Sequence, residues 1–223
     1  MFKPKHVYIE KEALDYTLGK ELKKQFEDMQ IPVDILESNR VNFLRGKSVQ
    51  EKYEIGKRVL VIGVRRTLEF QSCKPSAHYQ LPLVTGCIGK CEYCYLNTNL
   101  KDKPFTRIYV NLDDILKKAK RYTQTGKFKP TIFEGSATSD PVPVEPYMHA
   151  LAKSIEFFAK DPNTRFRFVT KFTDIDDLLH LKHNGHTEMR FSINTDTVIE
   201  SFEHGTPRAK QRIEAARKAI KAG

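Results

Sequence analysis

The sequence has no long apolar run, and we therefore expect neither a membrane-spanning protein nor a secreted one. The 223 residues include no stretch apolar enough to span a bilayer. The segment from Met1 to Lys5 also lacks the apolar run of a secretory signal. We therefore expect a cytoplasmic protein that does not cross a membrane. We find no internal repeat and no low-complexity tract, and the length suits one large domain or two small ones.

Cysteine is also scarce, with four residues in the chain. Thiols stay reduced in the cytoplasm, where structural disulfides are rare. A small number of closely spaced cysteines in such a protein is more typical of a metal site than of a disulfide framework. The cysteines are therefore interpreted as metal ligands.

Acidic residues are outnumbered by basic ones, 28 against 38, which gives a net charge of +10 and a pI near 9.3. A positive field of this size favours an acidic partner, and nucleic acid is the commonest one. The basic residues are scattered rather than gathered in a tail, as at Lys117, Lys118, Lys120 and Arg121. An ordinary soluble protein that is basic therefore remains the alternative.

Apolar periodicity predicts an α/β protein. Strands are expected at 6–10, 33–36, 59–64, 81–84, 131–133, 166–170 and 189–193. Helices are expected at 12–29, 112–122, 146–159, 174–183 and 208–221. From residue 79 onward, the repeated order of strand, loop and helix predicts parallel strands with outer helices, a partial TIM-type barrel. We assign residues 1–75 to a small N-terminal α/β segment and residues 76–223 to the barrel, as its first four strand–helix units.

Polar residues follow the carboxyl end of each expected barrel strand. The cysteines follow the first strand, residues 134–140 the second, Lys171 the third and residues 192–194 the fourth. Active sites of such barrels lie in the loops after the strands. We therefore expect these groups to converge on one face.

The most specific motif is Cys-x3-Cys-x2-Cys, formed by Cys87, Cys91 and Cys94, with Tyr93 just before the last cysteine. Three thiolates at this spacing hold three irons of a cubane cluster, and the fourth iron is left for a ligand other than protein. Such an iron is a reactive site. The spacing therefore predicts catalysis rather than a structural metal.

The alternative is a closed tetrahedral zinc site with Cys73 as the fourth ligand. Structural zinc loops usually have paired Cys-x2-Cys knuckles, and an expected strand separates Cys73 from the other three cysteines. Both features favour the iron–sulfur cluster. Without such a site, Cys73 is interpreted as a small buried apolar residue or a spectator thiol.

The run Cys87-x3-Cys91-x-Tyr93-Cys94 resembles the signature of the radical S-adenosylmethionine superfamily. The resemblance implies a [4Fe–4S] cluster on the three cysteines, with the open iron bound to the amino and carboxylate groups of S-adenosylmethionine. One electron from the cluster then cleaves the sulfonium and gives a 5′-deoxyadenosyl radical. Tyr93 is expected next to the bound adenine.

Longer motifs are similar to those of the spore photoproduct lyase family, and the resemblance covers the whole chain. They span residues 86–98, 133–141, 168–172 and 190–195. The resemblance implies a lyase that repairs 5-thyminyl-5,6-dihydrothymine, a UV lesion of spore DNA. The implied route is abstraction of hydrogen from C6 of the lesion, cleavage of the methylene bridge and return of a hydrogen atom to the thymine methyl radical.

The same resemblance implies partners and a location. They are UV-damaged DNA, a flavodoxin or ferredoxin as electron donor, and the spore core of a spore-forming bacterium, with the protein as a monomer. Barrels of the family usually continue for two more strand–helix units, so the barrel is expected to be incomplete. Two alternatives stay open, a radical enzyme with another substrate and a non-catalytic, zinc-stabilised module that binds nucleic acid.

By resemblance, Ser139, Lys171, Ser192 and Asn194 contact the cofactor. A lysine suits its carboxylate, and serine and asparagine suit its ribose hydroxyls. A solvated lysine and ordinary strand residues are the alternative. Glu134 stands where the superfamily often has a run that meets the cofactor's amino group, and a plain strand-ending turn is the alternative there.

At Ala137 the sequence departs from the family, which has cysteine at this position. That cysteine is the expected hydrogen donor to the product radical, and a methyl group has no weak S–H bond to give. We therefore hypothesise that the chain starts the reaction but does not finish it cleanly. Tyr95, just after the cysteines, is interpreted as a hydrogen relay or a stacking platform for a base, with packing as the alternative.

Overall fold

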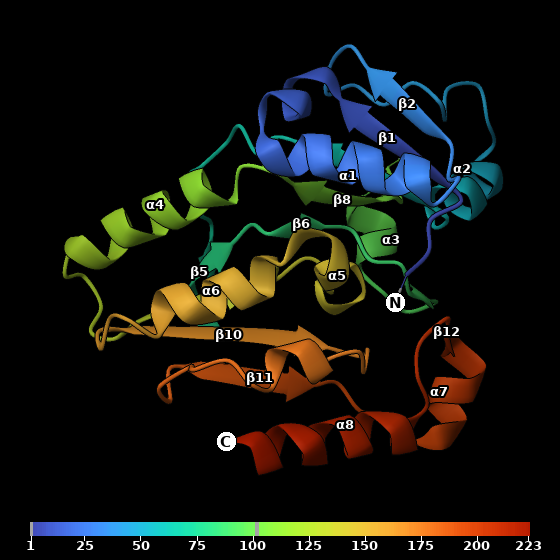
Figure 1. Ribbon diagram of the computed structural model, residues 1–223. Coiled ribbons are helices and arrows are strands. Elements are labelled where there is room, and N and C mark those ends of the chain that lie inside the picture. Colours follow the sequence, from blue (N-terminus) through green and yellow to red (C-terminus); the bar gives the residue numbers. More distant parts are fainter. Residues whose placement is uncertain (1, 101–102) are drawn as a thin grey trace.

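A computed structural model describes residues 2–100 and 103–223 and shows an α/β protein built on two five-stranded open sheets (Figure 1). A separate antiparallel pair is formed by β7 (Lys90–Cys91) and β12 (Glu203–His204). The first sheet contains, in spatial order, β2 (Val33–Leu36), β1 (His6–Glu10), β3 (Val59–Gly63), β8 (Thr106–Tyr109) and β6 (Val84–Thr85). The second contains β11 (Thr187–Phe191), β10 (Thr164–Thr170), β9 (Thr131–Gly135), β5 (Ala77–Leu81) and β4 (Ser72–Cys73). In each sheet the first four strands are parallel and the last is antiparallel.

Helices pack against the outer faces of both sheets, as Figure 1 shows for α1 on the first sheet and for α8 beside β11. The helices are α1 (Thr17–Asp28), α2 (Val49–Gly56), α3 (Leu96–Asn99), α4 (Leu112–Gln124), α5 (Glu145–Met148), α6 (Ala150–Phe158), α7 (Asp196–Phe202) and α8 (Ala209–Ala222). Within the described residues, none of them combines the length and apolar character needed to cross a bilayer. The predicted α/β class with parallel strands and outer helices is confirmed, and the strands form open sheets rather than a closed barrel.

The strand expected at 81–84 is two strands in different sheets. β5 ends at Leu81, and β6 begins at Val84. Pro82 has no N–H to donate to a ladder, and the N–H of Leu83 turns back to the carbonyl of Leu81 at 3.0 Å. The N–H of Ser136 also donates to that carbonyl, at 2.9 Å. The chain therefore passes from one sheet to the other just before the cysteines.

Two predicted helices are interrupted. The helix expected at 12–29 begins as a 3-10 turn, is broken by extended backbone at Tyr16 and continues as α1. The helix expected at 146–159 is divided at His149, whose φ of 48° is left-handed. A left-handed residue cannot continue a right-handed helix, so α5 and α6 are separate elements.

The prediction of a helix at 174–183 is wrong. The segment contains only a 3-10 turn, Asp176–Leu178. The N–H of Leu178 bonds to Ile175 and that of Leu181 to Leu178, each three residues back. These are the bonds of tight turns rather than of an α-helix.

Several short elements have no counterpart in the prediction, among them α2, α7 and β8. Each of the two helices has a local start signal, a capping box between Ser48 and Glu51 in α2 and Thr195 as the N-cap of α7. β8 and β6 complete the sheet that β1, β2 and β3 begin. The boundary near residue 75 stays a prediction, although the first sheet takes strands from both sides of it.

A stack of aromatic side chains links α6 to the second sheet. Phe158 is fully buried between Phe133 and Phe166, with ring centroids 4.9 and 5.4 Å away. Replacing such a side chain by alanine removes its buried area and leaves a cavity. The stack therefore fixes the two strands, β9 and β10, whose ends carry predicted site residues.

We expect Phe158→Ala to lower the free energy of unfolding by about 3–5 kcal/mol. Val49→Ala, at a side chain that is 84% exposed, is the control and should change it by less than about 0.5 kcal/mol. Urea unfolding of the metal-free proteins measures both values. Equal effects of the two substitutions would contradict this account of the core.

Candidate active site

The cysteine loop follows β6 and ends in α3. Cys91 is buried, and Cys87 and Cys94 are partly buried. Gly86 has a φ of +81°, and a Cβ there would lie 2.3 Å from the Phe105 carbonyl oxygen, so only glycine fits. The β-bridge between Gly86 and Ser139 then holds the start of the loop against the end of β9.

Gly89 forms a small cradle between two of the thiols. Its N–H donates to the sulfur of Cys87 at 3.3 Å. A Cβ on Gly89 would lie 3.5 Å from the sulfur of Cys87 and 3.9 Å from that of Cys91. The two sulfurs therefore face a common space that a larger residue would enter.

Lys57 holds the cysteine loop by hydrogen bonds from its side chain, and sequence reasoning did not identify it. Its buried ammonium donates to the carbonyls of Cys87 and Gly89 at 2.7 and 2.8 Å. Burial lowers the pKa of Lys57, and the three cysteines oppose this effect. No local pattern identifies it, because it lies 30 residues before the first cysteine that it contacts.

The thiols fit a thiolate-bound metal cluster. Burial raises the pKa of Cys87 to about 12 and also raises that of Cys91. Metal binding requires the thiolate form, so a bound cation would reverse this shift and release protons. Among the described residues, no three His, Cys, Asp or Glu side chains are grouped to hold one metal ion. In a cubane cluster, by contrast, the thiolates bind different irons and need not meet at one point.

Three predicted cofactor residues meet at one carboxylate, that of Glu203. Oε1 of Glu203 accepts from the hydroxyl of Tyr93, from the amide of Asn194 at 2.6 Å and from the ammonium of Lys171 at 3.3 Å. The Asn194 amide also donates to the Tyr93 hydroxyl at 3.0 Å. The ammonium of Lys171 lies 5.6 Å from the centroid of the Tyr93 ring, within range of a cation–π contact.

The two predicted serine contacts follow β9 and β11, the strands on either side of β10. The hydroxyl of Ser139, after β9, donates to the carbonyl of Gly86. The N–H of Ser192, after β11, donates to Thr170 at 2.9 Å. Lys171 lies between them, directly after β10. The expected convergence at the strand ends is therefore present for these residues.

Asp140 fixes the backbone at Lys171. It is among the polar residues 134–140 expected after the second barrel strand, but no role of its own was predicted for it. Its buried carboxylate accepts from the N–H of Lys171 and from the hydroxyl of Thr170, both at 2.8 Å. Burial raises the pKa of Asp140 to about 6, and these hydrogen bonds oppose the rise. Its place directly after Ser139 was the available signal.

Glu134 has different neighbours. It lies within β9 and pairs with the guanidinium of Arg190, and it accepts from the hydroxyl of Ser76 at 2.6 Å. Among the described residues, its carboxylate contacts Ser76 and Arg190 and not Glu203 or the partners of Glu203. The structure thus gives Glu134 an ion pair across the second sheet, and its predicted contact with a cofactor stays a prediction.

Ala137 and Tyr95 are in direct contact. The hydroxyl of Tyr95 donates to the carbonyl of Ala137 at 3.0 Å. Burial raises the pKa of Tyr95, and the charges of Cys94 and Cys73 raise it further. Tyr95 therefore connects the cysteine loop to the alanine at the expected donor position.

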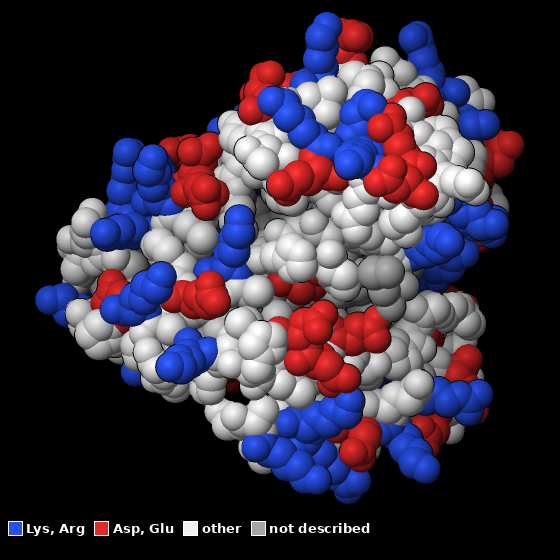
Figure 2. Space-filling view, viewed as in Figure 1, with Lys and Arg blue, Asp and Glu red and all other residues white. Residues whose placement is uncertain are grey.

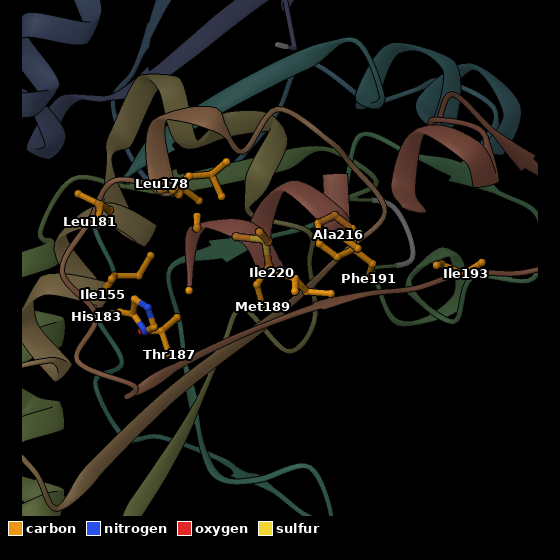
Figure 3. Close-up of a pocket in the computed structure, with 14 residues that line it drawn as sticks. Ile155, Leu178, Leu181, His183, Thr187, Met189, Phe191, Ile193, Ala216 and Ile220 are labelled. Carbon is orange, nitrogen blue, oxygen red and sulfur yellow. The ribbon is translucent and has the colours of Figure 1, made fainter. Parts of the chain in front are cut away.

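Of two cavities in the structure, one is lined by the predicted site residue Ala137 and the other by no predicted site residue. Figure 3 shows the larger, an apolar cavity of about 420 Å³ between β11 and α8, with Met189, Phe191 and Ile220 in its wall. No predicted site residue lines it. The smaller, of about 210 Å³, is lined by Ala137 and Arg65. The second cavity therefore opens beside the expected site of hydrogen return.

The positive charge is not gathered on the face shown in Figure 2. Lysine and arginine side chains there are interspersed with aspartate and glutamate. Several basic residues are paired, for example Lys118 with Glu69 and Lys218 with Asp176. Net charge alone therefore does not mark a nucleic-acid surface on this face.

The fold and the site together define a class, an α/β protein in which a three-cysteine loop is held against the ends of parallel strands. A family model described as spore photoproduct lyase matches residues 2–223. The chain belongs to the spore photoproduct lyase family.

Curated relatives and solved structures agree with this assignment. Spore photoproduct lyase of Clostridium acetobutylicum is 51% identical over 219 residues, which cover 98% of this chain and 65% of the relative. That of Bacillus subtilis is 48% identical over 223 residues, 100% of this chain and 65% of the relative. The chain thus spans about two thirds of the length of these relatives.

Among solved structures, a spore photoproduct lyase mutant with bound AdoMet and dinucleoside spore photoproduct has a TM-score of 0.96 and 49% identity, covering 100% of this chain and 66% of that one. A spore photoproduct lyase complexed with dinucleoside spore photoproduct has a TM-score of 0.96 and 48% identity, with the same coverage. The predicted fold class is confirmed by these matches.

The acid stability of the metal-free protein tests the carboxylate of Glu203. Burial alone would raise its pKa, but hydrogen bonds from Tyr93, Asn194 and Arg212 lower it from 4.5 to about 2. Its contribution to stability is therefore present above pH 4.5 and is lost as the pH falls toward 2. We expect the difference in unfolding free energy between the unsubstituted chain and Glu203→Gln to shrink over this range. A difference that stays constant would contradict the lowered pKa.

Proposed function

We propose that this chain contains the catalytic centre of a DNA-repair lyase that reverts the spore photoproduct, 5-thyminyl-5,6-dihydrothymine, to two thymines. The observation that best supports the proposal is the meeting of the three-cysteine loop with Lys171, Tyr93 and Asn194 at the strand ends. Solved relatives named for bound AdoMet and for the dinucleoside lesion support the same chemistry.

In this proposal Cys87, Cys91 and Cys94 hold three irons of a [4Fe–4S] cluster, and S-adenosylmethionine binds the fourth. When bound, these groups supply a 5′-deoxyadenosyl radical for abstraction of hydrogen from the lesion. The protein contributes position and shelter. The N–H of Gly89 donates to the sulfur of Cys87 and tunes the electron density on the ligand.

The side chains around Glu203 bind the organic cofactor. The ammonium of Lys171 pairs with its carboxylate, and the ring of Tyr93 packs beside its adenine. Ser139, Ser192 and Asn194 donate to or accept from its polar groups. Glu134 is a proposed contact for the amino group, although its present partners are Arg190 and Ser76.

The lesion occupies the space beside Ala137. Arg65 lines the same cavity, and its guanidinium suits a phosphate of damaged DNA. Tyr95 is hydrogen-bonded to the carbonyl of Ala137, and in this proposal it relays hydrogen or stacks on a base. A lesion inside a DNA duplex must leave the base stack to enter such a space.

The proposal includes partners and a location. The substrate is UV-damaged DNA, and a flavodoxin or ferredoxin supplies the electron. The protein acts as a monomer in the cytoplasm of the spore core. The named source organisms of the relatives, which include Bacillus subtilis and Clostridium acetobutylicum, agree with a role in spores.

Iron content tests the ligand assignment. After anaerobic reconstitution, we expect the unsubstituted protein to be brown and to lose its iron when Cys87, Cys91 or Cys94 is changed to alanine, because each thiolate holds one iron. Cys73→Ala is the matched control and should keep its iron. A colourless protein that holds one zinc ion per chain, and loses it when Cys73 is changed to alanine, would support the closed zinc site instead.

Product analysis on a synthetic lesion dinucleotide tests the role of Ala137. We expect trapped adducts or wrongly quenched thymine from the unsubstituted protein, because alanine has no S–H bond to give. Ala137→Cys should raise the fraction of intact thymine several-fold without changing cofactor cleavage.

Clean thymine from the unsubstituted protein would contradict the hypothesis of impaired hydrogen return. Cys73→Ser then tests for another donor, because Cys73 is the remaining cysteine of the four. A loss of clean product in that variant would move hydrogen return from position 137 to Cys73. A dinucleotide that stays intact while cofactor is cleaved would favour a different substrate.

A further inference from the structure

Glu203 was not a predicted site residue, yet it touches three of them. It lies just after α7, and its carboxylate is fully buried. Lys171, Tyr93 and Asn194 come from three different segments of the chain and share its Oε1 atom. This one atom is therefore a common partner of three side chains, which also contact one another through Tyr93.

Arg212 holds the other side of the carboxylate. Its guanidinium donates to Oε2 of Glu203 at 2.5 Å, and both side chains are fully buried. The same guanidinium donates to the carbonyls of Ser192 and Pro207 at 2.9 and 2.8 Å and to the hydroxyl of Thr206 at 2.8 Å. Arg212 thus connects Glu203 to Ser192, the fourth predicted cofactor residue.

Backbone pairing sets Glu203 against the cysteine loop. In the β12–β7 pair, Glu203 is opposite Cys91 and His204 is opposite Lys90. The N–H of Glu92 donates to the carbonyl of Phe202 at 2.9 Å. The carboxylate is therefore fixed relative to a predicted iron ligand as well as to the cofactor residues.

We propose that Glu203, held by Arg212, is a positioning residue that sets Lys171, Asn194 and Tyr93 for binding S-adenosylmethionine beside the cysteine loop. The inference rests on the proposed function. A lysine side chain has a long flexible stem, and holding its ammonium before the ligand arrives removes part of the cost of ordering it. Two cations, Lys171 and Arg212, share the single carboxylate of Glu203, so this carboxylate does not neutralise both of them, and the ammonium of Lys171 can also meet the carboxylate of the ligand.

The test is the affinity of the anaerobically reconstituted protein for S-adenosylmethionine, measured by equilibrium dialysis. We expect Glu203→Gln to weaken binding by roughly 10- to 100-fold, as loss of an outer-shell partner commonly does. Iron per chain should not change. The electron paramagnetic resonance signal of the reduced cluster should still shift on addition of S-adenosylmethionine, but only at correspondingly higher concentration.

Two further variants separate positioning from folding. Glu200→Gln removes an exposed carboxylate from α7 that pairs with Arg208, and it should bind S-adenosylmethionine as the unsubstituted protein does. Glu203→Gln leaves the buried Arg212 unpaired and can fail to fold for that reason. The double variant Glu203→Gln with Arg212→Met removes both charges, and we expect it to keep its iron and still bind S-adenosylmethionine weakly.

Unchanged or tighter binding in Glu203→Gln, or normal binding in the double variant, would overturn the proposal. Tighter binding would mean that Glu203 competes with the ligand for Lys171 instead of orienting it. If the unsubstituted protein and Glu200→Gln hold iron but bind no S-adenosylmethionine, the proposed function fails. The two failures are therefore distinguishable in one set of measurements.

Discussion

The cysteine loop is held from two sides by backbone pairing, and the arrangement of the site depends on this constraint. Gly86 bridges to Ser139 after β9, and Cys91 pairs with Glu203 after α7. These contacts bring residues more than 50 and more than 100 positions apart to one place. The residues that follow β9, β10 and β11 lie at one edge of the second sheet because these strands are parallel.

Burial and nearby positive charges have opposite effects on the pKa values of the cysteine thiols. Burial keeps the thiols protonated, as the raised pKa of Cys87 shows, and so favours the neutral loop in the absence of metal. The surrounding cations favour the thiolate form. Lys57 lies under the loop, and Lys171 lies near Cys91, whose pKa its charge lowers against the larger effect of burial. A bound metal cluster would stabilise the deprotonated thiolate form of the cysteines.

Much of the fold could be predicted from sequence because long apolar patterns identify buried strands. β1, β2 and β3 lie where apolar runs predict them, and β9, β10 and β11 overlap the predicted ranges. Prediction failed where the local pattern was ambiguous. Residues 174–183 contain helical apolar spacing, but they form turns between β10 and β11. Pro82 divides one apolar run between two sheets.

The candidate site was predicted in part for a similar reason. The cysteines and Lys171 stand in motifs or directly after strands, where position in the chain indicates position in space. Glu203, Arg212 and Lys57 have no such motif, because tertiary contacts alone bring them to the site. Gly205 and Pro207, which lie between α7 and α8, were a local signal of a chain break near Glu203. A carboxylate beside such a break is common, so the signal is weak.

The central claim is that the three thiols leave one iron free to bind S-adenosylmethionine. Electron–nuclear double resonance on the reduced, reconstituted protein tests it most directly, with ¹⁵N in the amino group of added S-adenosylmethionine. The account predicts a ¹⁵N coupling to the cluster that disappears when unlabelled S-adenosylmethionine is used instead. A reduced cluster whose spectrum shows no ¹⁵N coupling at saturating S-adenosylmethionine would contradict it.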